Sequence, residues 1–419
     1  MKKMVYKRVI NLMENTRLSK VVFYLMVLCV SLIGFFKGVL AESGGKDAQW
    51  YPANLFSKDI DFYSFFLENF NDWFMRSVPN YYYQLYYLLY PISSVSWESF
   101  KLIWFLGNIT LLLFFLFQVK KDFNFDYKKM GIIFLPFFIG FPLILLFTNG
   151  QSTVLILVLA YLAWKHRDNK WLLPIFLSLL TLKYSFGVPI VFGFLLMGYY
   201  RSVLFGGLIT LLFPLMYSIQ FNLNFVSAIF LPFKVSTSPT TRPLGSGPGD
   251  LMSLYGQFFD GPLLGINVLT ISLLLFIGLF AFLAIRYRLD KKTIFIGSLL
   301  FSLFGFYHFG HDYVLFILIV PFMFNLRFFK WMYGYLLIFC LMPRIIRVWD
   351  FVFESEIGVK PFMMNKYFVM FNVSVLIIYF FVIIRDDIIS KKRGVKRRYI
   401  NFKDFKSQSQ ENLLMNVDS

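Results

Sequence analysis

The chain has 419 residues, of which 58% are hydrophobic, 21% are aromatic and only 15% are charged. A soluble domain of this length cannot bury so much apolar surface, which excludes a soluble protein. Uninterrupted apolar runs of about 18 or more residues recur along the chain, as in transmembrane helices, whereas a β-barrel would show shorter alternating segments. The net charge of +18 comes mainly from basic residues in short loops between apolar runs, which is typical of a membrane protein that follows the positive-inside rule and not of a nucleic-acid-binding protein.

The first apolar run extends from Val21 to Ala41 and follows a basic leader, residues 1–20. A cleavable signal peptide is the alternative, because residues 39–41 resemble a small-residue cleavage site. The leader is long for a signal peptide. We therefore predict an uncleaved first helix that starts in the cytoplasm and ends outside, near residue 42.

Eleven further apolar segments are predicted to span the membrane. They lie at about 98–119, 130–148, 152–164, 171–183, 184–199, 203–220, 263–286, 293–310, 312–326, 330–347 and 366–384. Several are shorter than the roughly 20 residues that cross a bilayer, which predicts broken or re-entrant helices shielded by their neighbours. Together with the first helix they predict an all-α polytopic membrane protein with about 12 transmembrane helices.

The connections between these segments alternate in character. Those at 120–129, 165–170, 286–292 and 327–330, and the tail at 391–398, are basic and therefore predicted to be cytoplasmic. The other side receives two long loops, 42–97 and 221–262, and a shorter one around 348–365. Residues 1–385 are predicted to form a single transmembrane domain, and residues 386–419 a basic, polar cytoplasmic tail without order.

The first outer loop contains two carboxylates, Asp59 and Asp61, in the sequence KDIDFY. Around them, residues 57–74 and 80–92 repeat aromatic and aliphatic side chains near helical spacing, which predicts amphipathic helices on the membrane surface. Membrane anchoring accounts for the aromatics but not for the carboxylates, since anionic headgroups repel them. The acids therefore indicate a site, and the alternative is a helix cap or a solvated loop acid.

The second outer loop includes a stretch rich in Ser, Thr, Pro and Gly at residues 236–250. This composition predicts a mobile segment. Such a segment either closes over a substrate or serves as a plain linker.

The order of these blocks resembles the GT-C class of integral-membrane glycosyltransferases, and in detail the polyprenyl-phosphate-mannose-dependent mannosyltransferases of glycosyltransferase family 87. The matching blocks are Asp59-Ile60-Asp61-Phe62-Tyr63 for the family's D-φ-x-φ-Y motif, Tyr90-Pro91 for its Tyr-Pro, 148–164 for its Gly-Gln before a helix, 172–192 for its small-residue helix ending in Lys and then Pro, and 306–321 for its late His-containing segment. Bulky side chains near Lys183 and the missing Ser-Pro-x-Ser-Trp lead depart from the family pattern.

The resemblance implies a GT-C-like fold and a cofactor-independent transfer of a mannose-like hexose. The implied donor is a polyprenyl-phosphate sugar, and the implied acceptor is a glycan or glycolipid. The reaction would take place on the outer face of the plasma membrane of the cell.

The chemistry of such a transfer requires few groups. The lipid phosphate leaves as an anion, so one general base suffices to take the proton of the attacking acceptor hydroxyl, and a base opposite the leaving group implies inversion. Asp59 occupies the position of the family's base, and Asp61 is its local rival. Tyr63 and Gln151 lie in the matching blocks and are predicted substrate contacts.

Cations are needed to hold the donor phosphate. The candidates lie at or near the predicted outer face: Lys183, Arg242, Arg344 and Arg347. Snorkelling toward lipid headgroups is the alternative for each of them.

His308 and His311 are spaced i and i+3, with Asp312 beside them, and suit phosphate binding or orientation of the acceptor; packing is the alternative. No metal site is predicted, because Cys29 and Cys340 both lie in apolar segments and no HExxH motif is present.

Two other functions compete with this one. A transporter or flippase of lipid-linked oligosaccharides would carry charged residues near mid-span and an internal repeat of spans. A surface-polysaccharide polymerase would place its key Arg and His residues in a large late outer loop. The predicted partners of the transferase are the donor, the acceptor and the lipid bilayer, and no nucleic acid.

Overall fold

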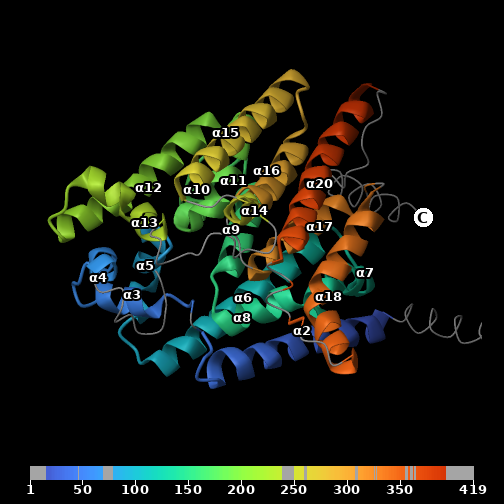
Figure 1. Cartoon of the computed structure of the whole chain (residues 1–419), viewed down its shortest axis with the longest axis horizontal. Coiled ribbons are helices and arrows are strands. Elements are labelled where there is room, and N and C mark those ends of the chain that lie inside the picture. Colours follow the sequence, from blue (N-terminus) through green and yellow to red (C-terminus); the bar gives the residue numbers. More distant parts are fainter. Residues whose placement is uncertain are drawn as a thin grey trace, which may run out of the picture.

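The structure is a computed structural model that describes residues 16–45, 47–68, 79–237, 250–258, 262–306, 310–324, 326, 328–353, 357–358, 362 and 365–392. Within these residues every regular element is a helix, and no strand is present (Figure 1). The predicted all-α class is therefore confirmed for this part of the chain.

Long helices alternate with short or interrupted ones. In the first half of the chain these are α2 (Thr16–Phe35), η1 (Phe36–Leu40), α3 (Trp50–Phe56), α4 (Phe62–Glu68), α5 (Tyr83–Leu89), η4 (Tyr90–Ile92), α6 (Trp97–Asp122), α7 (Tyr127–Ile139), α8 (Phe141–Asn149), α9 (Thr153–Lys165), α10 (Leu172–Leu180), η5 (Thr181–Lys183) and α11 (Tyr184–Leu196). In the second half they are α12 (Tyr200–Gln220), α13 (Phe225–Thr237), α14 (Leu251–Phe258), α15 (Pro262–Arg286), α16 (Lys291–Gly305), η6 (Gly310–Leu315), α17 (Phe316–Met323), α18 (Phe329–Phe353) and α20 (Lys366–Lys392).

Several of these helical segments are long and apolar enough to cross a membrane. By length and composition alone there are six in the described part of the chain: Arg17–Leu40, Trp97–Asp122, Leu172–Leu196, Tyr200–Gln220, Leu269–Arg286 and Lys366–Lys392. Of these, Leu172–Leu196 folds back at Lys183. The pair α7 and α8, bent by 60° at its break, raises the number to seven if it forms one broken span. The chain is thus a multi-pass membrane protein, and the total of about 12 transmembrane helices stays a prediction.

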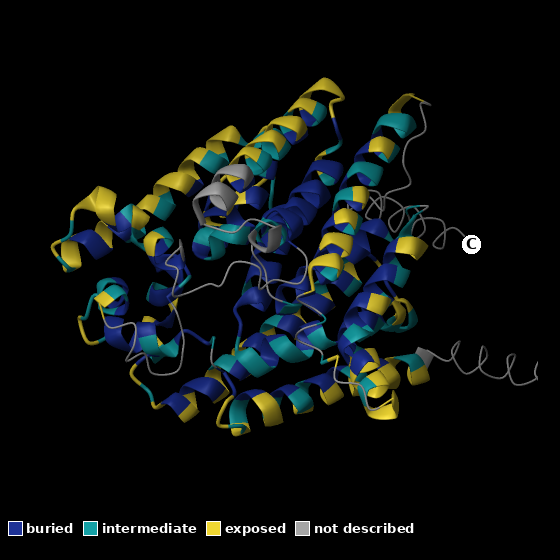
Figure 2. Cartoon of the chain, in the orientation of Figure 1, coloured by how far each residue is buried: buried dark blue, intermediate teal, exposed yellow. Residues whose placement is uncertain are grey.

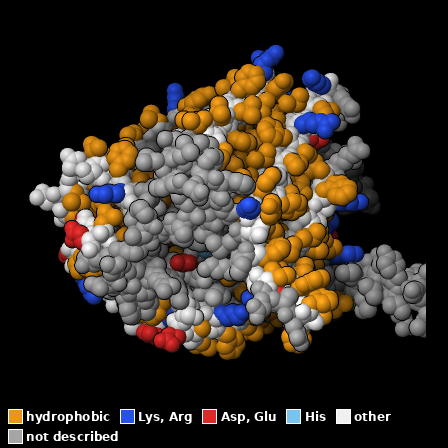
Figure 3. All heavy atoms as spheres, viewed as in Figure 1, with side chains coloured by type: hydrophobic (Ala, Val, Ile, Leu, Met, Phe, Trp, Pro, Cys, Tyr) orange, Lys and Arg blue, Asp and Glu red, His pale blue; other side chains and the backbone are white. Residues whose placement is uncertain are grey.

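The outward faces of the long helices are apolar. Figure 2 shows exposed residues along α2, α12, α15 and α20, and Figure 3 shows a broad band of hydrophobic side chains on the same face of the molecule. Exposed side chains include Leu204, Leu208 and Ile219 of α12 and Leu275 and Ile285 of α15. Such faces suit contact with lipid tails, which are as apolar as leucine.

One end of the bundle collects the short helices α3, α4, α5 and α13, at the left of Figure 1. Gln220 at the end of α12 donates a hydrogen bond to Asp59 (2.8 Å), and Trp50 of α3 donates one to the carbonyl of Val95 (3.1 Å). The first contact ties the connection between η1 and α6 to α12, and the second joins the two ends of the connection itself. We call this the loop end.

The opposite end collects basic connections, and we call it the basic end. Lys165 at the end of α9 lies 2.8 Å from Asp122 at the end of α6. Lys291 at the start of α16 donates a hydrogen bond to the Tyr199 hydroxyl (2.9 Å), and Lys391 of α20 lies 3.3 Å from Asp290. The connections predicted to share one side of the membrane therefore lie together.

Helices α10 and α11 form a hairpin instead of one straight span. At Lys183, between them, the backbone leaves the helical region (φ −117°, ψ 86°). A Cβ on Gly187 would lie 2.4 Å from the Leu180 carbonyl oxygen, seven residues earlier. In a straight helix these positions are about 10 Å apart along the axis, so the chain must fold back.

Both arms of this hairpin point toward the basic end, because residues just before α10 and just after α11 line one cleft there. At 1.5 Å per residue the arms are about 14 and 20 Å long, shorter than the hydrocarbon thickness of roughly 30 Å. The hairpin tip, Lys183, therefore lies within the bundle. This supports the prediction that the short segments 171–183 and 184–199 are broken or re-entrant.

The loop-end helices differ from the prediction of surface-lying amphipathic helices. Helices are present within both predicted ranges, as α4 and α5, but their aromatic side chains pack inside the protein: Phe62, Tyr63, Tyr83 and Tyr86 are at most 1% exposed. Tyr83 and Tyr217 of α12 have ring centroids 4.6 Å apart. These aromatic side chains therefore pack against α12. The periodicity of the sequence is the same for packing inside the protein and for anchoring in the membrane, so it could not separate the two.

Two predicted boundaries also change. The tail predicted to begin at residue 386 begins later, because α20 continues to Lys392 and Asp387, fully buried, accepts a hydrogen bond from the Asp290 amide (2.8 Å). The predicted loop 221–262 contains α13 and α14. Its Ser- and Gly-rich residues 238–249, like residues 393–419, lie outside the described residues.

Candidate functional site

Three interrupted elements meet beside the loop-end helices. The tip of the α10–α11 hairpin contributes Lys183, the break between α8 and α9 contributes Gln151 and Thr153, and η6 contributes Asp312. Backbone that is not regular helix is tolerated at membrane depth only where protein buries it or where it lines a cavity. A convergence of such breaks is therefore a candidate functional site.

The centre of this site is a buried ion pair. The Lys183 Nζ lies 2.5 Å from the Asp312 Oδ1, and the Thr153 hydroxyl donates to the same oxygen (2.7 Å). The Lys183 side chain is 13% exposed and the Asp312 side chain 3%. A buried pair of this kind contributes little net stability because both ions lose their hydration. Ionisable residues inside a membrane bundle instead indicate a functional site.

His311 and Tyr81 flank the ion pair. The His311 Nε2 lies 3.6 Å from the Asp312 Oδ1, and the imidazole is buried. The Tyr81 hydroxyl donates to Gln151 Oε1 (2.8 Å), and the Lys183 Nζ lies 5.7 Å from the Tyr81 ring centroid. We call Tyr81, Gln151, Thr153, Lys183, His311 and Asp312 the ion-pair cluster.

The environment keeps the Tyr81 phenol protonated. Burial raises the pKa of Tyr81 above its usual value of 10.0, and the carboxylates of Asp312 and Asp47 act in the same direction, whereas Lys183 opposes them. A neutral phenol is a hydrogen-bond donor at physiological pH. Tyr81 can therefore hold the Gln151 carbonyl in a fixed orientation.

Asp47 approaches the cluster through its backbone. The Gly45 amide donates to the Thr148 carbonyl and the Asp47 amide donates to the Asn149 carbonyl, both at 2.8 Å. At Gly150 the positive φ of 69° favours glycine, and a Cβ there would lie 2.9 Å from the Cβ of Ala48. The connection after η1 is thus fixed beside the residue that precedes Gln151, which brings Asp47 within electrostatic range of Tyr81.

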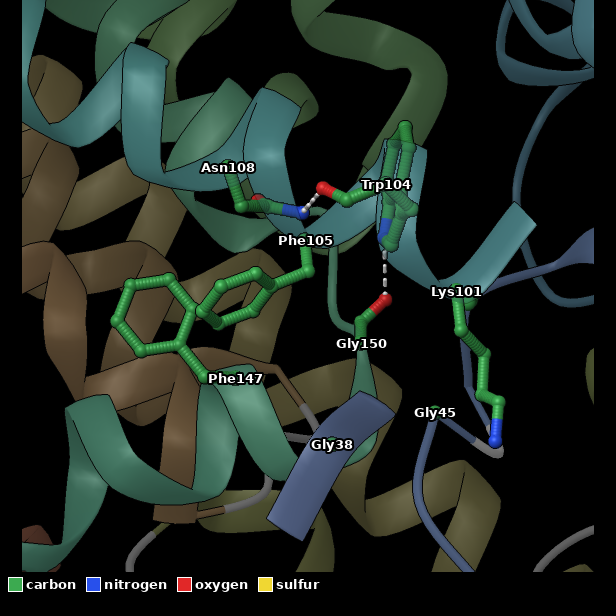
Figure 4. A pocket seen from close by; sticks show the side chains of 9 residues that line it. Gly38, Gly45, Lys101, Trp104, Phe105, Asn108, Phe147 and Gly150 are labelled. Atoms are coloured by element: carbon green, nitrogen blue, oxygen red, sulfur yellow. Dashed lines mark hydrogen bonds between the residues drawn. The ribbon is translucent and has the colours of Figure 1, made fainter. Parts of the chain in front are cut away.

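A small cavity behind this connection supports it (Figure 4). The Trp104 indole N–H donates to the Gly150 carbonyl (2.7 Å), and Asn108 donates to the Trp104 carbonyl (3.0 Å). The buried Lys101 side chain runs along Gly45, and its ammonium lies 5.5 Å from the Trp97 ring centroid. The cavity measures about 10 Å³, which is room for about one water molecule. The hydrogen bonds around the cavity hold the Gly150 backbone in place, and the cavity itself is too small for a substrate.

Asp61 caps a helix. Its Oδ1 accepts hydrogen bonds from the amides of Tyr63 (3.2 Å) and Ser64 (3.1 Å), and its Oδ2 accepts one from the Ser64 hydroxyl (2.6 Å). The Tyr217 hydroxyl adds a further bond to Oδ1 (2.5 Å). These contacts are those of an N-cap at the start of α4, which was the alternative for Asp61.

Tyr63 links the cap to the cluster. Its fully buried hydroxyl donates to the carbonyl of Tyr81 (2.5 Å). The amide of Tyr82 in turn donates to the carbonyl of Leu182, next to Lys183 (2.8 Å). Tyr63 therefore helps to position the cluster, and its hydroxyl is engaged by the backbone rather than directed at a ligand.

Asp59 lies apart from the cluster. Its side chain is exposed, its φ of 57° is in the left-handed region, and its carboxylate accepts a hydrogen bond from Gln220. Within the described residues no hydrogen bond or ion pair joins Asp59 to Lys183, His311 or Asp312. The assignment of Asp59 as the base stays a prediction.

The remaining predicted residues are scattered. Arg344 and Arg347 are exposed on α18, and no hydrogen bond or ion pair among the described residues joins them to Lys183 or Asp312. Arg242 and His308 lie outside the described residues, so their predicted roles stay predictions. Among the residues that the structure describes, no group of three His, Cys, Asp or Glu side chains could hold a metal ion.

The sequence predicted Lys183, Gln151, His311 and Asp312 as site residues, and all four belong to the ion-pair cluster. The sequence did not single out Tyr81, Thr153 or Asp47 as site residues. Two features of the sequence could have pointed to them: Asp47 follows the first span closely, and Thr153 stands at the start of a short helix. Neither residue belongs to a motif with a characteristic spacing.

A comparison of the chain with family models finds no match, and comparisons with curated proteins and with solved structures find none either. The function is therefore argued from the site and from the motif resemblance.

Proposed function

We propose that the chain is a membrane glycosyltransferase. It moves a mannose-like hexose from a polyprenyl-phosphate donor to a glycan or glycolipid acceptor on the outer face of the plasma membrane. The observation that carries this proposal is the buried Lys183–Asp312 pair at the tip of a helical hairpin, next to the loop-end helices. The order of the sequence motifs supports it.

Lys183 is the group that binds the donor phosphate. The acceptor oxygen attacks the anomeric carbon, the bond from that carbon to the phosphate oxygen breaks, and the lipid phosphate departs with the electron pair. Charge grows on the phosphate during this step, and a buried ammonium already oriented by Asp312 and Thr153 stabilises it without reorganisation. Asp312 thus acts as a positioning residue.

The acceptor proton goes to a carboxylate of the connection between η1 and α6. Asp61 caps α4, and among the other carboxylates of this connection Asp47 and Asp59 are the two candidates. The backbone contacts beside Gln151 favour Asp47, whereas the motif resemblance favours Asp59. A base on the side opposite the leaving phosphate gives inversion at the anomeric carbon, as in inverting glycosidases.

The transfer test uses purified protein with a panel of radiolabelled polyprenyl-phosphate sugars and a lipid-extract acceptor. Wild-type protein is expected to transfer label from one donor, and Lys183→Ala protein to lose this transfer. Lys165→Ala is the matched control, because Lys165 is the cation of another ion pair, at the basic end. Absence of label transfer from every donor would refute the proposal.

A lipid-linked oligosaccharide transporter is the second candidate, because a buried ion pair at broken helices is also a feature of transporters. Proteoliposomes that contain a labelled polyprenyl-phosphate oligosaccharide and no acceptor separate the two. Translocation without any transfer would favour the transporter. The surface-polysaccharide polymerase differs from the transferase in its product, which would be a ladder of lengths instead of a single addition.

A further inference from the structure

A basic cleft lies at the basic end of the bundle, between the connection before α10 and the turn between α11 and α12. Its volume is about 400 Å³. The lining side chains and backbone come from both connections: Arg167, Asp168, Lys170, Gly198, Tyr199, Tyr200, Arg201 and Ser202. Three cations and one carboxylate thus converge on one hollow, although the two connections are about 30 residues apart in sequence.

The single carboxylate of the lining is already engaged. Asp168 accepts a hydrogen bond from the Tyr199 hydroxyl (3.1 Å). That hydroxyl also accepts one from Lys291 (2.9 Å), whose ammonium lies 4.3 Å from the Tyr199 ring centroid. Asp168 forms no ion pair with Arg167, Lys170 or Arg201 among the described residues, and the lining keeps a net positive charge of three cations against one carboxylate.

The cations keep their donors available. Arg167 stacks 4.5 Å from the Trp164 ring centroid and uses one N–H for the Trp164 carbonyl, which leaves four of its five donors. Arg201 is exposed and makes no ion pair with a described residue. The adjacent α12 begins at Tyr200 and adds the positive end of a 21-residue helix dipole. Arginine forks and free amide N–H groups together match the oxygens of a phosphate.

Exposed aromatics beside the cleft place it at the level of lipid headgroups. Trp171 is 73% exposed and Tyr200 is 65% exposed, and such side chains collect at the interface between bilayer and water. Lys170 lies 5.5 Å from the Trp171 ring centroid, at the same level. A ligand in the cleft would therefore meet water on one side and headgroups on the other.

We propose that this cleft binds a phosphate group, supplied by the headgroup of an anionic phospholipid in the leaflet at the basic end. The proposal is independent of sugar transfer, since the cleft and the ion-pair cluster lie at different ends of the α10–α11 hairpin. A soluble phosphate compound would meet the same hydrogen-bond donors. Titration with a lipid and with pyrophosphate distinguishes these two sources of the phosphate group.

The test uses the full chain in a neutral detergent. The midpoint of thermal unfolding is measured while the protein is titrated with dihexanoyl phosphatidylglycerol, dihexanoyl phosphatidylcholine or inorganic pyrophosphate, because a ligand that binds the folded state raises this midpoint. The test variant is Lys170→Ala with Arg201→Ala, two exposed side chains. The control is Lys121→Ala with Lys129→Ala, which removes the same charge from exposed positions outside the cleft.

Phosphatidylglycerol is expected to raise the wild-type midpoint, and the test variant to bind it about tenfold more weakly, as expected for loss of charge-assisted hydrogen bonds. The control variant is expected to match wild type. Arg201→Glu, a single exposed change, is expected to abolish the shift. A shift with pyrophosphate alone, lost in the test variant, would assign the site to a soluble phosphate. Equal shifts with phosphatidylcholine, or equal losses in test and control variants, would overturn the proposal.

Discussion

Replacing Lys183 with Ala leaves a buried carboxylate without its cation. Asp312 keeps the hydrogen bond from the Thr153 hydroxyl, and the His311 Nε2 lies 3.6 Å from the same oxygen. Removing one partner of a buried ion pair costs about 3–5 kcal/mol, because the remaining charge stays out of water and has lost its counter-charge. We therefore expect Lys183→Ala to lower the free energy of unfolding by this amount and to abolish sugar transfer.

A second variant separates stability from function. In Lys183→Met with Asp312→Leu both charges are replaced by apolar side chains of similar length, a change that is often neutral for stability. We expect this double variant to unfold close to wild type and still to be inactive, because no cation remains for the phosphate.

The measurements are the free energy of unfolding in detergent and the transfer rate per folded molecule. Lys165→Ala serves as the reference for a less buried pair, in which the lysine side chain is 26% exposed, and should cost less than Lys183→Ala. Full transfer by the double variant would refute the reasoning, since the pair would then be purely structural.

Three further predictions concern the loop end and the topology. Asp47→Asn is expected to lower the transfer rate by about 10²- to 10⁴-fold, the usual contribution of a general base; if Asp59→Asn has this effect instead, the motif resemblance identified the base correctly. Burial raises the pKa of Tyr82 to about 12 from 10.0, so the folded state holds this proton more tightly than the unfolded state. The resulting stability is complete below pH 10 and is lost as the pH rises toward 12, which unfolding measurements across this range can follow. A reporter fused after residue 70 should score outside the cell and one after residue 290 inside, and reporters on the same side would contradict the threading.

The positions of the helices could be predicted because each apolar run is a local signal. The segment 98–119 corresponds to Trp97–Asp122, and 203–220 to Tyr200–Gln220. The reversal at Lys183 also agrees with the prediction, because the sequence analysis ended one segment at residue 183 and began the next at residue 184. The run from Leu172 to Leu196 has one charged residue, Lys183, and this lysine marks the turn, where no Gly or Pro stands.

The site was predicted in part, and the division follows the range of the interactions. The cap formed by Asp61 depends on the two or three residues that follow it, so a local pattern could raise it as an alternative. The Lys183–Asp312 pair joins residues 129 positions apart; the sequence raised each of them separately as a candidate but did not pair them. The approach of Asp47 to Asn149 depends on how two connections pack, which one sequence does not reveal.

The contacts between the loop-end helices and α12 have a consequence for biosynthesis. Tyr217 and Gln220 bind carboxylates that precede them by 156 and 161 residues. At a synthesis rate of 5–20 residues per second, the partners of Asp61 and Asp59 leave the ribosome about 8–30 s after the carboxylates themselves. During this interval the aromatic side chains of α4 and α5 have no α12 to pack against. The nascent chain therefore exposes an apolar surface that chaperones and proteases can recognise, and a chain truncated before α12 should be degraded faster than the complete one.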